Sequence, residues 1–254
     1  MKNKNIKVKH TGGNSYHNKL FLQSYKDALQ EFSGVVNGLI KSTTEDCNEW
    51  ENMAWHAVEL LRLERGGEGG MTLLRNVKFR DGDTFIHSVN VAMICYDIAK
   101  WAGKDKAYRE EAALCGLMHD VGKLTVPPEI LKKPGKLSEF ETKQMRKHTL
   151  QGYYSLLFFN NENVRLAALQ HHERCDGSGY PYGVTGEEIN EFAKIVAIAD
   201  VYDALTADRV YRRGMTPEKA LAIMERDKDT FAPEFFSVFM EKATELLVKN
   251  ADAV

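Results

Sequence analysis

Residues 117–121, Leu117-Met118-His119-Asp120-Val121, are the most informative segment of the chain. They set a histidine and an aspartate among apolar neighbours in a helical pattern, and both side chains are hard to bury unless they are paired or bound to a metal ion. On either side, apolar residues recur at three- and four-residue steps, which is typical of helices. The predicted helices cover residues 20–39, 42–63, 84–101, 105–118, 138–158, 161–172, 192–207, 217–227 and 233–248. Strand-like alternation is nearly absent, so the sequence predicts an all-α fold.

Helix-end signals support these boundaries. Ser138–Glu141 has the capping-box pattern, and Thr216 is an N-cap candidate followed by proline at the first helical position. Gly103 follows a helical pattern as a C-cap candidate. Ser42–Glu45 is a second capping-box pattern, which opens a helix in the N-terminal region.

Residues 65–70, Arg65-Gly66-Gly67-Glu68-Gly69-Gly70, hold four glycines in five positions and mark the main boundary. We expect a polar, flexible arm over residues 1–18, a helical N-terminal extension over 19–65 and a main domain over 72–254. The two helices of the extension carry apolar stripes that a lone hairpin cannot bury. They therefore pair with a second copy as a homodimer or pack on the main domain.

Composition excludes several classes of protein. The formal net charge of −2 argues against a surface for polymeric nucleic acid. The four cysteines lack Cys-x-x-Cys spacing and fit a reducing compartment. The basic start has no apolar signal region, and no run of about 18 apolar residues predicts a membrane span. We expect a cytoplasmic protein.

Five of the eight histidines lie in helical patterns with apolar surroundings: His87, His119, His148, His171 and His172. The adjacent pair His171-His172 would repel if both rings were protonated, and metal binding removes this problem because ligand histidines are neutral. Asp200 also lies between apolar neighbours. The alternative is that these are satisfied core residues or a helix-pairing salt bridge. A nitrogen and oxygen donor set without thiolate suits iron or manganese, although zinc and nickel stay open.

The order of motifs resembles the HD-GYP subgroup of the bacterial HD-domain phosphohydrolases. The matching segments are His119–Lys123, His148–Gly152, His171–Pro181 and Ile198–Arg209, within residues 72–248. The resemblance implies an HD-domain helical bundle as the catalytic domain. It also implies that Asp120 bridges two divalent metal ions. The other ligands would be His87, His119 and Asp200 for one ion, and His148, His171 and His172 for the second.

The resemblance further implies that Lys123 points toward the scissile phosphate. A lysine there can protonate the departing ribose oxygen, while two ions lower the pKa of water and neutralise charge on the phosphate. The alternative is a solvated loop lysine.

Residues 176–183 follow the double histidine directly and are the candidate substrate loop. Gly177 lets the backbone approach a ligand closely, and Tyr180 can stack on a base or hydrogen-bond a phosphate. An ordinary turn would have the same composition. Arg209 and Arg212 lie one helical turn apart and resemble the family's basic pair for substrate phosphate, with an exposed salt-bridged pair as the alternative.

These implications predict a phosphodiesterase for a cyclic dinucleotide, with cyclic di-GMP as the leading substrate. The product is the linear dinucleotide, and further hydrolysis to GMP stays open. The alternatives are a hydrolase of hybrid cyclic GMP-AMP, a general nucleotide phosphohydrolase, and an inactive binding module that signals by ligand occupancy.

Asp83 bears on the number of metal ions. It lies one helical turn before His87, where some family members have a glutamate that helps to hold a third ion. Aspartate is shorter by roughly 1.5 Å of reach, and Asp81-Gly82-Asp83-Thr84 is also an N-cap sequence. We therefore expect two ions, with a third as the alternative, and accumulation of the linear product.

Overall fold

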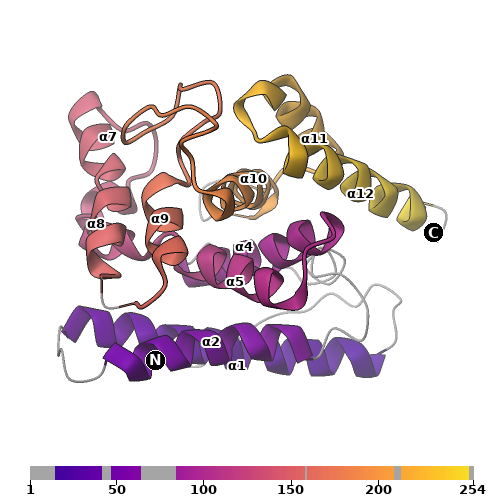
Figure 1. The fold of residues 1–254 in the computed structure, drawn as a ribbon, viewed down its shortest axis with the longest axis horizontal. Coiled ribbons are helices and arrows are strands. Elements are labelled where there is room, and N and C mark those ends of the chain that lie inside the picture. The colour runs from indigo at the N-terminus through magenta and orange to yellow at the C-terminus, as the bar shows by residue number, and fades with distance from the viewer. Residues whose placement is uncertain (1–14, 42–46, 64–83, 158, 209–212, 252–254) are drawn as a thin grey trace.

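The computed structural model describes residues 15–41, 47–63, 84–157, 159–208 and 213–251 (Figure 1). The regular elements in these ranges are helices, which confirms the all-α prediction. They are α1 (Ser15–Lys41), α2 (Cys47–Leu63), α4 (Thr84–Trp101), α5 (Lys106–Met118), η2 (Val121–Thr125), α6 (Pro128–Leu131), α7 (Glu139–Arg146), α8 (His148–Ser155), α9 (Glu162–Gln170), α10 (Glu191–Thr206), α11 (Pro217–Arg226), η3 (Lys228–Thr230) and α12 (Pro233–Ala251).

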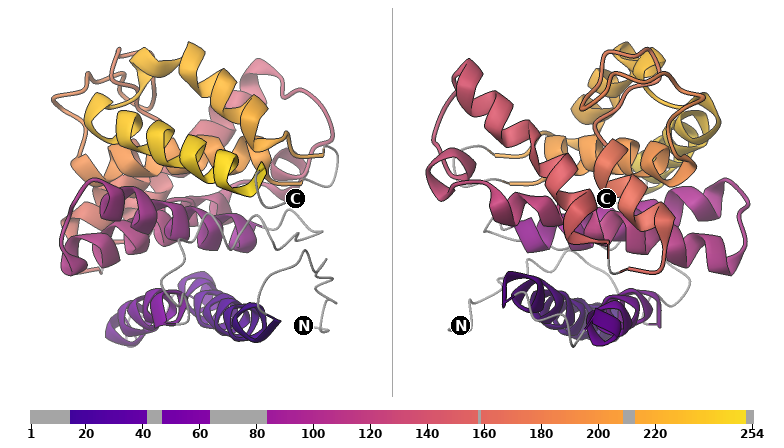
Figure 2. Two further views of the ribbon diagram at one scale, coloured as in Figure 1. Left: turned by 90° about the vertical axis from the view of Figure 1, so that its right-hand side faces the viewer. Right: turned by 60° about the vertical axis from the view of Figure 1, so that its left-hand side comes forward.

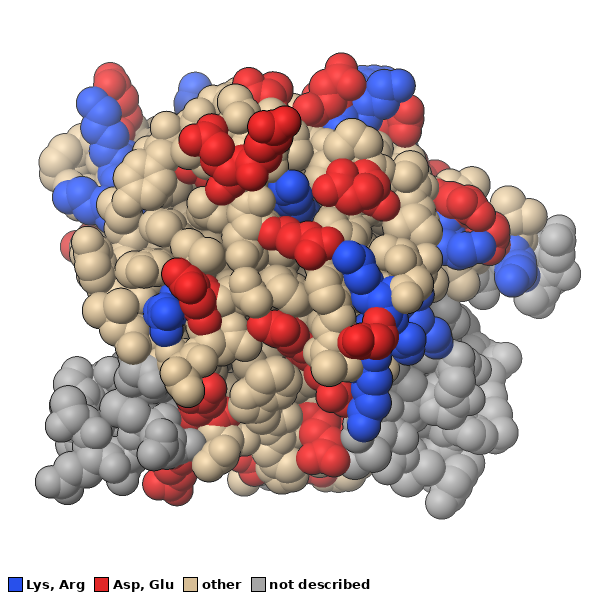
Figure 3. Space-filling view, viewed as in Figure 1, with Lys and Arg blue, Asp and Glu red and all other residues tan. Residues whose placement is uncertain are grey.

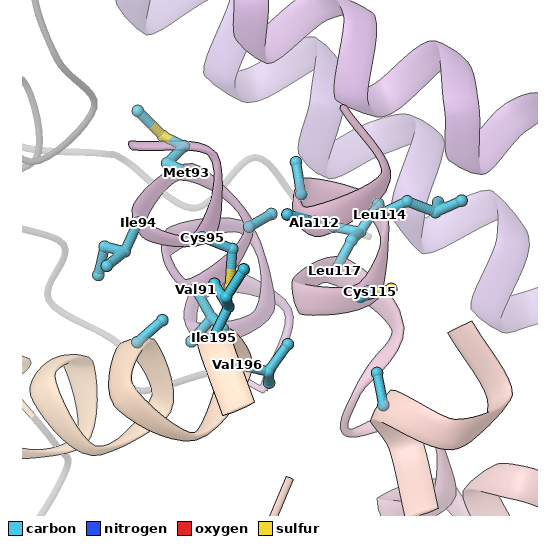
Figure 4. Close-up of a cluster of buried hydrophobic side chains, with 14 of the residues drawn as sticks. Val91, Met93, Ile94, Cys95, Ala112, Leu114, Cys115, Leu117, Ile195 and Val196 are labelled. Carbon is cyan, nitrogen blue, oxygen red and sulfur yellow. The ribbon is translucent and has the colours of Figure 1, made fainter. Parts of the chain in front are cut away.

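Helices α4 and α5 form the centre of the molecule, and α10 packs against both. Gly116 allows the close approach of α4 and α5, because a Cβ atom there would lie 3.0 Å from the Ala92 Cα and 2.9 Å from the Cys95 Sγ. Buried apolar side chains project from α4, α5 and α10 into the core (Figure 4). They include Val91, Ile94, Cys95, Ala112, Leu114, Leu117, Ile195 and Val196.

The N-terminal helices α1 and α2 form a layer beneath α4 and α5 (Figures 1 and 2). Tyr25, Phe32 and Val36 of α1 are buried, as are Ala57 and Leu61 of α2. Helix α1 contacts α4, and α2 contacts α5. The apolar stripes of this hairpin are thus covered by the rest of the same chain.

Two predicted helix starts and one predicted helix end are confirmed. The Ser138 side chain accepts a hydrogen bond from the Glu141 N–H, and the Glu141 carboxylate accepts one from the Ser138 N–H. Thr216 caps α11 with Pro217 in the first turn. Gly103 follows α4 with a φ of +74°, a value that favours glycine. The patterns at 42–45 and 65–70 lie outside the described residues.

The single helix predicted over residues 138–158 is wrong, because α7 and α8 are separated at Lys147. Side chains satisfy carbonyl groups near this break. The His148 Nδ1 lies 2.7 Å from the Met145 carbonyl oxygen, and the Thr149 hydroxyl donates to the Arg146 carbonyl oxygen. Apolar spacing does not reveal such a break, because the pattern continues through it.

On the face seen in Figure 3, acidic and basic side chains lie in small, mixed groups. This distribution is consistent with the formal net charge of −2. Among the described residues, no helix is both long and apolar enough to cross a membrane.

Candidate metal centre

Five histidines and two aspartates from different elements meet in the interior. His87 comes from α4, His148 from α8 and Asp200 from α10. His119 and Asp120 follow the end of α5, and His171 and His172 follow the end of α9. Their donor atoms form two groups, one of His87, His119 and Asp120 and one of His148, His171 and His172.

The Asp120 carboxylate lies between the two groups, with one oxygen toward each. Its Oδ2 lies 3.3 Å from His119 Nε2 and 3.7 Å from His87 Nε2. Its Oδ1 lies 3.5 Å from His148 Nε2 and 3.7 Å from His171 Nε2. A carboxylate in this position can bind one cation through each oxygen.

Asp200 gives a second carboxylate to the same space. Its Oδ1 lies 3.0 Å from His87 Nε2, and its Oδ2 lies 3.9 Å from His172 Nδ1. Asp200 thus stands beside His87, as the family resemblance implies, and also faces the other histidine group.

Contacts at Nδ1 orient four of the rings. His119, His148 and His171 each place Nδ1 2.7 to 3.1 Å from a backbone carbonyl oxygen of their own helix or turn. His87 Nδ1 lies 2.7 Å from Asp203 Oδ2. In His119, His148 and His171 the Nδ1 donates its proton to a carbonyl oxygen, so the Nε2 of each ring faces the centre as a potential ligand atom.

The unpaired polar atoms fit a metal site. Among the described residues, His87 Nε2, His119 Nε2 and Asp120 Oδ1 are buried without a hydrogen-bond partner. An unsatisfied buried donor or acceptor costs about 1–3 kcal/mol. The two histidine nitrogens lie beside Asp120 Oδ2 and the Asp120 Oδ1 faces the other histidine group, so these three atoms are suitable ligands for bound cations.

The pKa of His87 differs from those of three other histidines of the site. Burial lowers the pKa of His148 to about 3 and also lowers the pKa of His171 and of His172, so these rings are neutral near pH 7. Burial alone would also lower the pKa of His87, but the carboxylates of Asp200 and Asp203 outweigh it and raise the value to about 10. A proton on His87 thus occupies the side of the ring that a cation would use.

Two glycines bring the two groups together. A Cβ atom on Gly122 would lie 1.9 Å from the His148 carbonyl oxygen and 2.4 Å from the Gly152 nitrogen. Only glycine allows this approach of η2 to α8. The glycines of the segments His119–Lys123 and His148–Gly152 therefore place Asp120 next to His148.

Lys123 is directed into the centre. Its Nζ donates to Asp120 Oδ2, and the side chain is partly exposed. Burial raises the pKa of Asp120, but the charge of Lys123 and the contact with His119 hold it well below the ordinary value. An ammonium group at the edge of a carboxylate-centred site is well placed for an anionic ligand.

The loop at residues 176–183 is anchored by Glu173, which is buried. Its carboxylate accepts hydrogen bonds from the backbone N–H groups of Tyr182, at 2.7 Å, and Gly183, at 3.0 Å. A Cβ atom on Gly179 would lie 2.4 Å from the Arg174 nitrogen, so the loop folds tightly over Glu173. Gly177 has a φ of +78°, which favours glycine.

Tyr180 of this loop lies over the centre. Its ring stacks on His172 with centroids 4.7 Å apart, and the Arg146 guanidinium carbon lies 4.7 Å from the ring centroid. Arg146 at the end of α7 is exposed. The side chain thus brings a cation to the rim of the site.

Some predicted site residues lie outside the described residues, namely Asp83, Arg209 and Arg212. The sequence reading did not single out Glu173, Asp203 or Arg146. The spacing of three residues between Asp200 and Asp203 was a usable signal, because it places both carboxylates on one helical face. Arg146 had no such signal, since it stands among other charged residues.

Comparisons with known proteins identify the family. The HD domain family matches residues 43–234. The chain is 38% identical over 173 residues to a cyclic di-GMP phosphodiesterase of Pseudomonas aeruginosa, covering 67% of this chain and 42% of that protein. It is 43% identical over 145 residues to the 3'3'-cGAMP-specific phosphodiesterase 1 of Vibrio cholerae, covering 57% of this chain and 34% of that protein. The chain thus spans less than half the length of these two relatives.

A solved structure shares the fold. It is an HDG"Y"P protein from Bdellovibrio bacteriovorus, with a TM-score of 0.67 and 18% sequence identity over 93% of this chain and 75% of that chain. The chain belongs to the HD domain family and, within it, to the HD-GYP subgroup.

Proposed function

We propose that this chain is a metal-dependent phosphodiesterase that hydrolyses a cyclic dinucleotide. The observation that carries the proposal is the position of Asp120, with one carboxylate oxygen toward each histidine group. Two bound ions would supply positive charge and lower the pKa of water. Asp120 and its neighbours would hold them, and Lys123 and Tyr180 contact these predicted ligands at Asp120 and His172.

The side chains divide the remaining work. The Lys123 ammonium moves from Asp120 to the substrate phosphate and protonates the departing ribose oxygen. Glu173 holds the loop that carries Tyr180, and Tyr180 and Arg146 contact the substrate at the rim. Asp120, Asp200 and the five histidines would hold the ions. Iron or manganese suits this donor set, because thiolate is absent from it.

Cyclic di-GMP is the leading substrate, because the relatives above include a cyclic di-GMP phosphodiesterase that matches two thirds of the chain. The 3'3'-cGAMP-specific relative supports hybrid cyclic GMP-AMP as the second candidate. An inactive binding module is disfavoured by the joint presence of Lys123 and the two groups of donors.

The test is a hydrolysis assay of metal-stripped protein reloaded with Mn²⁺ or Fe²⁺, run on both cyclic dinucleotides and followed by chromatography. We expect the linear dinucleotide to form and accumulate before GMP appears. Binding of both compounds without turnover by the reloaded protein would favour the inactive module. A preference for cyclic GMP-AMP would replace the leading substrate and leave the reaction unchanged.

Two finer points are also proposals. We propose a cytoplasmic location, supported by Cys95, Cys115 and Cys175, which are free thiols.

Homodimerisation through the N-terminal helices has less support, because the exposed large apolar side chains of the described residues lie on other elements. Light scattering across a concentration series tests for the dimer.

A further inference from the structure

Helix α1 reaches the metal centre through a chain of hydrogen bonds. Tyr25 is buried, and its hydroxyl donates to Asn90 Oδ1 of α4 at 2.7 Å. The Asn90 Nδ2 donates to Asp203 Oδ1 of α10 at 2.9 Å. The other oxygen of Asp203 lies 2.7 Å from Nδ1 of His87. Four side chains thus connect the N-terminal hairpin to a predicted metal ligand.

The direction of each hydrogen bond follows from the chemistry of the groups. An ionised carboxylate only accepts, so Asn90 presents its amide nitrogen to Asp203. The amide oxygen therefore faces Tyr25, whose hydroxyl must donate. Burial, with the charge of Asp203, raises the pKa of Tyr25 well above its ordinary value, so the hydroxyl keeps its proton. The chain of bonds ends by fixing the Nδ1–H of His87, so Nε2 is the atom that would bind an ion in place of its proton.

The hydrogen bonds from Tyr25 to His87 depend on one another. Apart from the Tyr25 hydroxyl, the described contact between α1 and the start of α4 is largely apolar, as in the edge-to-face pair of Phe32 and Phe85, with centroids 5.7 Å apart. Removing one buried partner leaves the next without its hydrogen bond. Asn90 would then lose its orientation, and Asp203 would lose a fixed donor.

We propose that Tyr25 is a positioning residue for the metal centre and that α1, which carries it, helps to set the metal affinity of the centre. The inference rests on the proposed function. By holding Asn90 and Asp203, Tyr25 sets the orientation of the His87 ring and thus the affinity of the ion bound by His87. A partner or ligand that displaces α1 would weaken this ion without touching the centre.

The test is Mn²⁺ binding to the metal-stripped full chain, with free Mn²⁺ followed by electron paramagnetic resonance. Replacing a residue behind a ligating histidine costs about 10- to 100-fold in metal affinity. Asp203 is the residue behind His87, and Tyr25 lies two hydrogen bonds beyond Asp203. Tyr25→Phe should therefore lower the affinity for one Mn²⁺ by about threefold to tenfold. The second Mn²⁺ should bind as in the wild type.

Tyr108→Phe is the matched control. It removes the same hydroxyl from a ring that stacks on Phe192 on α10, with centroids 4.4 Å apart. We expect unchanged Mn²⁺ affinity for this variant. Circular dichroism melting of both variants separates an effect on the ion from loss of the fold.

Asn90→Leu completes the experiment as a double-mutant cycle. If Tyr25 acts through Asn90, adding Tyr25→Phe to Asn90→Leu causes no further loss of Mn²⁺ affinity. Equal affinities of wild type and Tyr25→Phe, or additive losses in the cycle, would overturn this inference while leaving the proposed function intact. Wild-type protein that binds no Mn²⁺ would overturn the proposed function and the inference together.

Discussion

Lys123 pairs with a predicted metal ligand and is also the proposed donor to the leaving group. Its ammonium group pairs with the Asp120 carboxylate, and its partly exposed side chain can turn toward an anionic ligand. A charge that acts as the leaving group departs stabilises the transition state more than the bound substrate.

Replacing Lys123 by alanine should therefore lower kcat by about 100-fold or more, with a much smaller change in KM. Steady-state kinetics on the metal-loaded enzyme gives both numbers. Lys133→Ala is the control, because Lys133 pairs with Glu141 away from the centre. A large rise in KM with unchanged kcat would assign Lys123 to binding only.

The residues of the site differ in how far the sequence could predict them. The histidines and aspartates stand in short motifs, so the resemblance implied their positions one by one. Asn90 and Asp203 could not be predicted as partners, because they are 113 residues apart and meet only through the packing of α4 on α10. Their roles depend on tertiary contact, which periodicity does not contain.

The close contact of η2 with α8 depends on Gly122. An alanine there would place its Cβ against backbone atoms of His148 and Gly152, which cannot move aside as a side chain can. Gly122→Ala should lower the free energy of unfolding by about 3 kcal/mol and reduce metal content.

Gly34→Ala in α1 is the matched control. Its Cβ would meet the terminal methyl group of Met53, the flexible end of a long side chain. Alanine also favours a helix over glycine by about 1 kcal/mol. Urea unfolding should show little change for Gly34→Ala, and an equal loss in both variants would contradict this account of Gly122.

Helix α7 has a pH-dependent start. Hydrogen bonds from Lys133 and from the Ser138 backbone lower the pKa of Glu141 from 4.5 to about 2. A carboxyl whose pKa is lower in the folded state stabilises the protein above pH 4.5, and this contribution is lost as the pH falls from 4.5 toward 2.

Glu141→Gln should accordingly lower Tm at pH 7, and the difference from wild type should shrink between pH 4.5 and 2. Thermal melts of the two metal-free proteins across this range check the prediction. A constant difference in Tm at every pH would show that the charge of Glu141 has no part in it.

The sequence predicts which segments are helical, but it does not predict where a helix is interrupted. The capping box at Ser138 and the cap at Thr216 are local signals that can be recognised from the residue types. The break at Lys147 and the short element η2 lie where Gly122 and His148 pack together. Apolar periodicity therefore gave one helix where the structure has two.

The N-terminal hairpin belongs to the same core as the domain beside it. Phe32 of α1 has 2% of its side chain exposed and packs edge-to-face on Phe85, two residues before His87. The sequence left two alternatives for these helices, since an apolar stripe does not reveal its partner. The structure places the described part of the stripe against α4 and α5.

Phe32→Ala should lower the free energy of unfolding by about 3–5 kcal/mol. Phe140→Ala removes the same ring from a site that is 67% exposed, and it should change the free energy of unfolding by about 0.5 kcal/mol or less. Chemical denaturation of both variants makes the comparison. If Phe32→Ala costs no more than Phe140→Ala, the hairpin does not stabilise the domain.

The arrangement of the whole molecule brings five segments together around Asp120, and the metal content of purified protein reports directly on its bridging role. Elemental analysis should find about two divalent ions per wild-type chain and a loss of both in Asp120→Ala, with Asp229→Ala at the wild-type value. Three tightly bound ions, one of them lost on replacing Asp83, would contradict the two-ion centre. Wild-type stoichiometry in Asp120→Ala would contradict the bridge itself.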